Sequence, residues 1–153
     1  MLRISKLTDY GTMLLAHLAD GDGDVRSATE LASETGIALP TVSKLLKALA
    51  REGLVISTRG ASGGYRLARE PREITAANII DALEGPVSIT ECSSADSHCD
   101  YEDHCSVGRA WQRINVAIRE ALDEVSLVDL KHANSPVPEF RFAGMPITVE
   151  RKP

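Results

Sequence analysis

Residues 27–67 constrain the fold most, because two short helical patterns there are followed at once by a strand, a glycine-rich loop and a returning strand. Ser27-Ala28-Thr29-Glu30 has the spacing of a capping box, which predicts a short helix that ends at Gly36. A second helix is expected over about 39–52, with Pro40 in its first turn. Its apolar stripe consists of Val42, Leu45, Leu46 and Leu49. Two helices joined by a tight glycine-containing turn form a helix-turn-helix.

The segment after these helices predicts a β-hairpin. Residues 54–58 favour a strand, residues 59–64 read Arg-Gly-Ala-Ser-Gly-Gly, and residues 65–67 favour the returning strand. A hairpin directly after the second helix of such a pair is a wing. An earlier helix is expected over about 8–19, capped by Thr8. We therefore predict a mainly α fold with a small β-hairpin, and a winged helix-turn-helix DNA-binding domain over residues 1–70.

Pro71 marks a boundary, after which a helix capped by Thr75 is expected to run to about Glu84. Residues 92–105 form a polar loop, and a long amphipathic helix is expected over about 106–124. Its apolar positions recur at steps of three and four: Val107, Trp111, Ile114, Ile118, Leu122 and Val125. A small wing domain cannot cover this stripe alone, so we expect the helix to pack against a second copy of the chain. Residues 71–133 are thus predicted to hold a polar loop and a dimerisation helix.

The ends of the chain and its overall composition exclude several classes of protein. Its 153 residues are close to one domain, and no apolar run approaches the ~18–20 residues of a membrane span. No secretory signal follows the first residues, so we expect a cytoplasmic protein with reduced thiols. Four of the seven prolines lie in residues 134–153, which predicts a mostly disordered tail.

The charge of the chain is unevenly distributed. The net charge is −5, which argues against a nucleic-acid-binding protein that is basic over its whole surface. However, residues 38–69 carry six Lys and Arg against one acid, whereas residues 86–133 carry nine acids against four bases. A chain that is acidic overall can still present a locally basic face to a polyanion.

The second helix of the helix-turn-helix carries polar residues opposite its leucine stripe. Thr41, Ser43 and Lys44 are placed to reach base edges in a major groove, and Lys47 and Arg51 to meet phosphates. Arg59, at the start of the predicted wing, suits the adjacent minor groove or the DNA backbone. The alternative is an ordinary solvated helix face. The turn, the wing and the charge distribution together favour DNA binding.

The three cysteines lie in the polar loop with the spacing C-x6-C-x5-C, at Cys92, Cys99 and Cys105, and His98 and His104 each precede one. Structural zinc usually uses closer cysteine pairs, although a Cys3His site is conceivable. An iron–sulfur cluster tolerates wider loops and prefers thiolates. Redox-active thiols are a third interpretation. An enzyme is not favoured, because the sequence has no C-x-x-C motif and no nucleotide-binding loop.

Several motifs together resemble the bacterial iron–sulfur winged-helix repressors of the IscR and NsrR type. They are Leu7-Thr8-Asp9-Tyr10, the wing stretch of residues 59–67, residues 74–80 (Ile-Thr-Ala-Ala-Asn-Ile-Ile), and the three cysteines before Trp111. The resemblance covers about residues 1–133, and the opening is most similar to members that regulate the Suf cluster-assembly genes. It implies a homodimer with the cysteine loops at the subunit interface. It also implies that Cys92, Cys99 and Cys105 bind an iron–sulfur cluster, one per subunit, whose state controls DNA affinity.

The fourth ligand of such a cluster is open. IscR-like members use a histidine three residues after the last cysteine, but Gly108 stands there in this chain and cannot ligate. NsrR-like members use an aspartate from the first helix of the partner subunit, a position that Asp9 occupies here. Asp9 also suits the positive end of its own helix. His98 and His104 are further alternatives.

We therefore expect a cytoplasmic, homodimeric repressor of iron–sulfur cluster assembly genes that binds a near-palindromic operator in double-stranded DNA. Two-fold symmetry would place its two recognition helices ~34 Å apart. The cluster is expected to contain two or four irons (2Fe–2S or 4Fe–4S). The alternatives are a repressor that responds to nitric oxide or redox state, and a winged-helix repressor that contains zinc.

Overall fold

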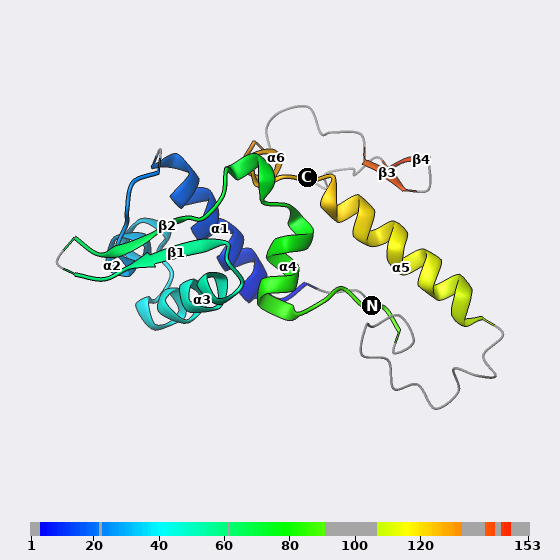
Figure 1. Cartoon of the computed structure of the whole chain (residues 1–153), viewed down its shortest axis with the longest axis horizontal. Helices are drawn as coiled ribbons and strands as arrows, with labels where there is room; N and C mark the ends of the chain where they lie inside the picture. The colour runs from blue at the N-terminus through cyan, green and yellow to red at the C-terminus, as the bar shows by residue number, and fades with distance from the viewer. Residues whose placement is uncertain are drawn as a thin grey trace.

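The computed structural model describes residues 4–21, 23–60, 62–90, 107–132, 140–142 and 145–147 (Figure 1). Helices predominate, and one antiparallel hairpin follows the third helix, so the predicted winged-helix architecture is confirmed. The first seven elements, in chain order, are α1 (Lys6–Asp20), α2 (Ala28–Thr35), α3 (Leu39–Arg51), β1 (Val55–Thr58), β2 (Gly64–Leu67), the 3-10 turn η1 (Pro71–Glu73) and α4 (Ala76–Glu84). They are followed by α5 (Gly108–Asp123), α6 (Leu127–Lys131), β3 (Phe140–Phe142) and β4 (Met145–Ile147).

Helix α1 begins earlier than the sequence predicts. Its cap is Ser5, whose side chain accepts a hydrogen bond from the Leu7 N–H, so the prediction of Thr8 as the cap is wrong. Thr8 is instead buried within the helix, and its hydroxyl donates to the Glu84 carboxylate at the end of α4. A tertiary contact therefore takes the side chain that a local signal assigned to capping.

The caps predicted for α2 and α4 are present. Ser27 and Glu30 form both hydrogen bonds of a capping box at α2, and Gly36 ends that helix with a φ of +70°. Thr75 caps α4 in the same way with Asn78. Ser126 and Asp129 cap the short helix α6.

One continuous hydrophobic core joins the helix-turn-helix to the later helices. Leu14, Leu31, Leu46 and Leu49 are fully buried, and Ile74 and Leu127 are buried in the same cluster. The backbone supports this packing, because the Leu127 N–H donates to the Ile74 carbonyl oxygen at 2.7 Å. The core therefore extends past residue 70.

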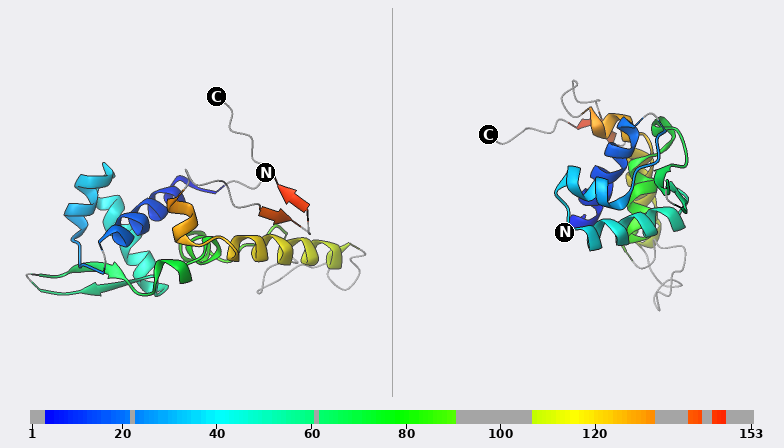
Figure 2. Two further views of the ribbon diagram at one scale, coloured as in Figure 1. Left: turned by 90° about the horizontal axis from the view of Figure 1, so that it is seen from above. Right: turned by 90° about the vertical axis from the view of Figure 1, so that its left-hand side faces the viewer.

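Helix α5 has a fastened half and a projecting half. Near its C-terminal end, the Arg119 guanidinium makes two hydrogen bonds to the Asp81 carboxylate of α4, at 3.1 and 2.6 Å. Its N-terminal half extends away from α1–α3 (Figure 2) and exposes Trp111 by 40% and Ile114 by 36%. No helix in the described part of the chain is long and apolar enough to cross a membrane.

Strands β3 and β4 form an antiparallel hairpin in which Phe140 pairs with Ile147. They lie within residues 134–153, the segment that is expected to be a mostly disordered tail. The other residues of that segment lie outside those that the structure describes.

Candidate nucleic-acid interface

Helix α3 separates an apolar face from a basic one. Val42, Leu45, Leu46 and Leu49 are buried in the core, which fixes the rotation of the helix about its axis. Lys44, Lys47 and Arg51 are consequently exposed, and Thr41 and Ser43 are half-buried near the N-terminal end. The structure thus brings the five predicted α3 residues to one element, with the lysines on its solvent side.

The positive charges of α3 have few internal partners. Arg51 lies 3.1 Å from the Glu52 carboxylate, but both side chains are well exposed, so this ion pair is weak. Neither Lys44 nor Lys47 forms an ion pair with another residue that the structure describes. The first turn of α3 also contains no acidic residue. A phosphate backbone would therefore meet this face without first displacing an intramolecular carboxylate from the lysines.

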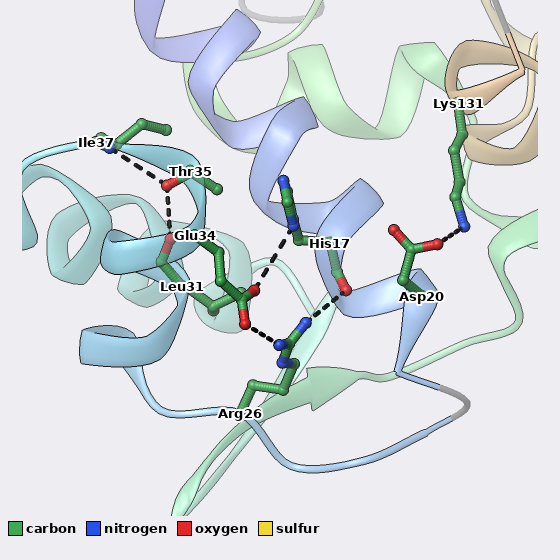
Figure 3. Close-up of polar contacts among 8 residues, drawn as sticks. All are labelled: His17, Asp20, Arg26, Leu31, Glu34, Thr35, Ile37 and Lys131. Atoms are coloured by element: carbon green, nitrogen blue, oxygen red, sulfur yellow. Dashed lines mark hydrogen bonds and ion pairs between the residues drawn. The ribbon is translucent and has the colours of Figure 1, made fainter.

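The turn that presents α3 is held by local hydrogen bonds (Figure 3). The Thr35 hydroxyl donates to the Leu31 carbonyl oxygen at 2.6 Å and accepts from the Ile37 N–H at 3.3 Å. Ile37 is buried, and Gly36 has a positive φ at which a residue with a side chain would be strained. These contacts stabilise the turn between α2 and α3.

The wing begins close to the end of α3. The Leu54 N–H donates to the Leu49 carbonyl oxygen at 2.9 Å, and the Leu54 side chain is buried. Beyond it, Val55 pairs with Leu67 and Thr58 with Gly64. Arg59 is exposed where the loop starts. The predicted arginine and the recognition helix therefore belong to one connected unit.

Glycine is required at two positions of the wing loop for different physical reasons. Gly60 has a φ of +113°, a conformation that L side chains rarely adopt. A Cβ at Gly63 would lie 2.5 Å from the Thr58 carbonyl oxygen, so the loop folds too tightly for any side chain there. The sequence predicts a flexible glycine tip, whereas the structure shows that these glycines also shape the turn.

The candidate cluster ligands are only partly described. Cys92, Cys99 and Cys105, with His98 and His104, lie outside the described residues. Among the described residues, no group of three or more His, Cys, Asp or Glu is arranged to hold a metal ion. Asp9 is exposed in the first turn of α1. Its nearness to the cysteines therefore stays a prediction.

The start of α1 is tied to the end of α4, which leads toward the cysteine segment. The Glu84 carboxylate accepts hydrogen bonds from the Thr8 hydroxyl and, at 2.7 Å, from the Ser5 N–H. These bonds hold the pKa of the Glu84 carboxyl below its usual value, and the bond from the Thr8 hydroxyl has the largest effect. The turn of α1 that carries Asp9 is thus fixed to the helix after which the cysteine segment begins.

Sequence reasoning missed a polar cluster between α1, α2 and the wing, formed by His17, Arg26 and Glu34 (Figure 3). Residue 26 lies between two predicted helices, where neither helical nor strand periodicity applies. Its only local signal is a basic residue beside the α2 cap. The cluster depends on tertiary contacts that a single sequence does not reveal.

Comparison with known proteins identifies the family. The model of the Rrf2 family, described as iron-dependent transcriptional regulators, matches residues 4–133. The chain belongs to the Rrf2 family. Rrf2 proteins are transcriptional regulators that bind DNA and are often dimers, so this chain is a regulator and not an enzyme.

Two Rrf2 relatives illustrate what the family shares. The transcriptional regulator CymR of Bacillus subtilis is 35% identical over 130 residues, which are 84% of this chain and 89% of CymR. The structure of B. subtilis CymR, described as the global cysteine regulator, has a TM-score of 0.67 at 38% identity and covers 87% of this chain and 98% of its own. The structure of IscR from T. potens has a TM-score of 0.61 at 32% identity, with 88% and 89% covered. Regulation of transcription by a winged-helix protein is common to them.

Proposed function

We propose that this Rrf2 protein is a homodimeric repressor that reads a near-palindromic DNA site with α3 and the wing. The observation that carries the proposal is the exposed lysine face of α3, which no described carboxylate neutralises. A helix of this kind fits a major groove, where its first residues reach base edges. We assign base contacts to Thr41, Ser43 and Lys44, and phosphate contacts to Lys47 and Arg51.

Arg59 extends the proposed contact to the neighbouring groove. It is exposed beside the narrow glycine turn, so the backbone of the wing can approach DNA closely. Arginine is the side chain best suited to a narrow minor groove with its concentrated negative potential. A regulator that binds chromosomal DNA in this way would act in the cytoplasm of a bacterium.

We propose that α5 pairs with α5 of a second copy. The exposed apolar side chains of its projecting half are those of a helix that lacks a partner surface. Trp111 and Ile114 lie three positions apart and are 40% and 36% exposed. A two-fold axis through this helix pair would place the two DNA-reading units one turn of the double helix apart, at ~34 Å from each other.

We further propose that the regulator senses an iron–sulfur cluster, one per subunit, of the 2Fe–2S or 4Fe–4S type. Cys92, Cys99 and Cys105 would supply three thiolates, and Asp9 of the partner subunit the fourth ligand. This donor set suits iron, because thiolates are the ligands that such clusters prefer. A bound cluster would supply a group that oxidation or nitric oxide can alter. In this chain, the hydrogen bonds that Glu84 accepts from Ser5 and Thr8 would hold the turn of α1 that carries Asp9 against α4 of its own subunit.

The regulated genes that we propose are those of iron–sulfur cluster assembly. Support comes from the resemblance of the motifs at residues 7–10 and 59–67, and the link to the Suf system rests on the opening motif alone. In functional terms, residues 1–70 would read DNA, and residues 71–133 would hold the cluster and join the subunits.

Substitution of one recognition-helix residue tests the DNA-reading assignment. Lys44→Ala is expected to weaken binding to a selected DNA site about tenfold, without changing the absorption spectrum of the protein. Fluorescence anisotropy with a labelled duplex measures this affinity. Unchanged affinity of the Lys44→Ala protein would remove α3 from the proposed interface.

Elemental analysis of the anaerobically purified protein tests the cluster. Iron and acid-labile sulfide with broad visible absorption are expected, and Cys99→Ala should remove both while the far-ultraviolet circular dichroism stays the same. Zinc with a featureless spectrum would instead support the zinc-containing repressor. Colourless protein without metal that binds DNA normally would refute a cluster-dependent mechanism.

A second candidate function follows from the similarity to CymR. That protein is named a cysteine regulator, so this chain would then regulate genes of cysteine metabolism and respond to thiols or redox state. The same preparation distinguishes the two functions, because a thiol-based response would persist in metal-free protein. Titration of the holoprotein with nitric oxide separates the nitric-oxide alternative from a response to cluster supply.

A further inference from the structure

Arg26 connects the wing to the body of the protein through its backbone. Its N–H donates to the Tyr65 carbonyl oxygen at 2.9 Å, and the Tyr65 N–H donates to the Arg26 carbonyl oxygen at 2.8 Å. These two bonds form an antiparallel bridge outside the β1–β2 pair. Arg26 thereby adds one residue of a third strand to the hairpin, on the β2 side.

The bridge is closely packed. A Cβ at Gly64 would lie 2.5 Å from the Arg26 carbonyl oxygen and 2.9 Å from the nearest methyl group of Val25. Because the first of these neighbours is backbone, it cannot move aside as a flexible side chain would. The glycine beside Tyr65 thus permits the backbone of residue 26 to approach the wing.

The side chain of Arg26 connects the same point to two helices (Figure 3). Its guanidinium pairs with the Glu34 carboxylate of α2 and donates to the His17 carbonyl oxygen of α1 at 3.4 Å. The second Glu34 oxygen lies 3.7 Å from His17 Nδ1. The Arg26 side chain is only 25% exposed, so this pair is better shielded from water than the Arg51–Glu52 pair of α3.

We infer that Arg26 is a positioning residue for DNA recognition, which fixes the wing relative to the helix-turn-helix. The inference deepens the proposed function and rests on its assignment of α3 and Arg59 to the DNA interface. A two-stranded hairpin is marginally stable alone, so its direction depends on what holds it. The hydrogen bond from Leu54 to Leu49 holds β1 to the end of α3. Arg26 holds β2 to α1 and α2.

The expected effect follows from the cost of ordering a mobile wing on DNA. Without the guanidinium, the wing would sample more orientations, and binding would have to restrict them again. The contact made by Arg59 would then contribute little affinity, whereas contacts made by Lys47 on α3 would be unaffected. Arg26 itself points toward Glu34 and His17, so it acts through the wing and not as a DNA ligand (Figure 3).

A double-mutant cycle measures this dependence. The probe is a labelled duplex of about 30 base pairs, selected from random sequences by the full-length wild-type protein. We expect Arg26→Ala and Arg59→Ala each to weaken binding about tenfold, and the double variant only about 10- to 20-fold. Arg26→Ala with Lys47→Ala should instead be additive, near 100-fold if Lys47→Ala alone costs about tenfold.

Two further variants guard against a simple loss of folding. Arg26→Lys keeps the charge but cannot span Glu34 and the His17 carbonyl as a guanidinium does, so it should reproduce most of the non-additivity with Arg59→Ala. Asp20→Asn removes a neighbouring ion pair between α1 and α6, outside the proposed DNA interface, and should leave affinity unchanged. Circular dichroism establishes that each variant is folded.

Additive losses for Arg26→Lys and Arg59→Ala would overturn the inference. So would an unchanged affinity of the Arg26→Ala protein, because the wing would then keep its position without the guanidinium. The DNA interface itself fails differently, since neither Arg59→Ala nor Lys47→Ala would then weaken binding.

Discussion

Gly64 shows how a single missing side chain can decide the position of the wing. A Cβ there would lie 2.5 Å from the carbonyl oxygen and 2.7 Å from the carbonyl carbon of Arg26. Gly64→Ala is therefore expected to lower the free energy of unfolding by about 1–3 kcal/mol, as overpacking against backbone does. Urea denaturation measures the change. The control is Ser62→Ala at the exposed tip, and equal stability of the two variants would show that the bridge yields without cost.

Glu84 gives the fold a defined response to acid. The pKa of its carboxyl is lowered mainly by the Thr8 hydroxyl and next by the Ser5 N–H. A carboxyl whose pKa is lower in the folded state stabilises the protein above its unfolded pKa, near 4.3 for glutamate, and this contribution is lost as the pH falls through the folded value. The stabilisation is thus present at neutral pH and lost in acid.

Glu84→Gln isolates that contribution. At pH 7 the variant is expected to be less stable by about 0.5 kcal/mol, a small value because the carboxylate is exposed and screened. The difference should shrink as the pH falls below about 4.3, because protonated glutamate and glutamine then make similar hydrogen bonds. Chemical denaturation between pH 3 and 7, in about half-unit steps, follows the difference. A gap that does not change with pH would contradict this account.

The helices and the hairpin were predictable because their signals are local. The Ser27–Glu30 box, Gly36 and the leucine stripe of α3 each lie within the element that they define. The cap of α1 was mispredicted because the partner of Thr8 is 76 positions away, at Glu84. The Arg26 bridge was missed for the same reason, since Tyr65 belongs to another element. Local sequence therefore predicts the parts of the candidate interface, but not the contacts that orient them.

The exposed stripe of α5 predicts how the helix behaves when its partner surface is disrupted. Ile114→Asp places a charge at the centre of the proposed helix pair, and burying an unpaired carboxylate costs about 3 kcal/mol or more. We expect dimerisation to weaken at least about 100-fold, so that monomer predominates at micromolar concentration. Sedimentation velocity measures the ratio of species. Glu120→Ala, away from the stripe, is the matched control, and a dimer that persists in Ile114→Asp would place the interface elsewhere.

The first helices and the helix that follows α5 contribute side chains to the same hydrophobic core. Leu127 follows the proposed dimerisation helix, yet it is fully buried with Leu14 and Leu46 of the first helices. Leu127→Ala is therefore expected to lower the free energy of unfolding by about 2–5 kcal/mol. Calorimetry should show one cooperative transition at a lower temperature. Two separate transitions would mean that the DNA-reading part and α5–α6 unfold independently.

The return of the chain after α5 has a practical consequence for anyone who shortens this protein. Truncation at residue 90 would remove Val125 and Leu127 and leave an open socket beside Ile74, in the body that carries the recognition helix. Such a fragment would lose partners on its own inner surface as well as the means to pair with a twin. The region of the chain that is proposed to form the dimer therefore also completes the core of the proposed DNA-binding unit.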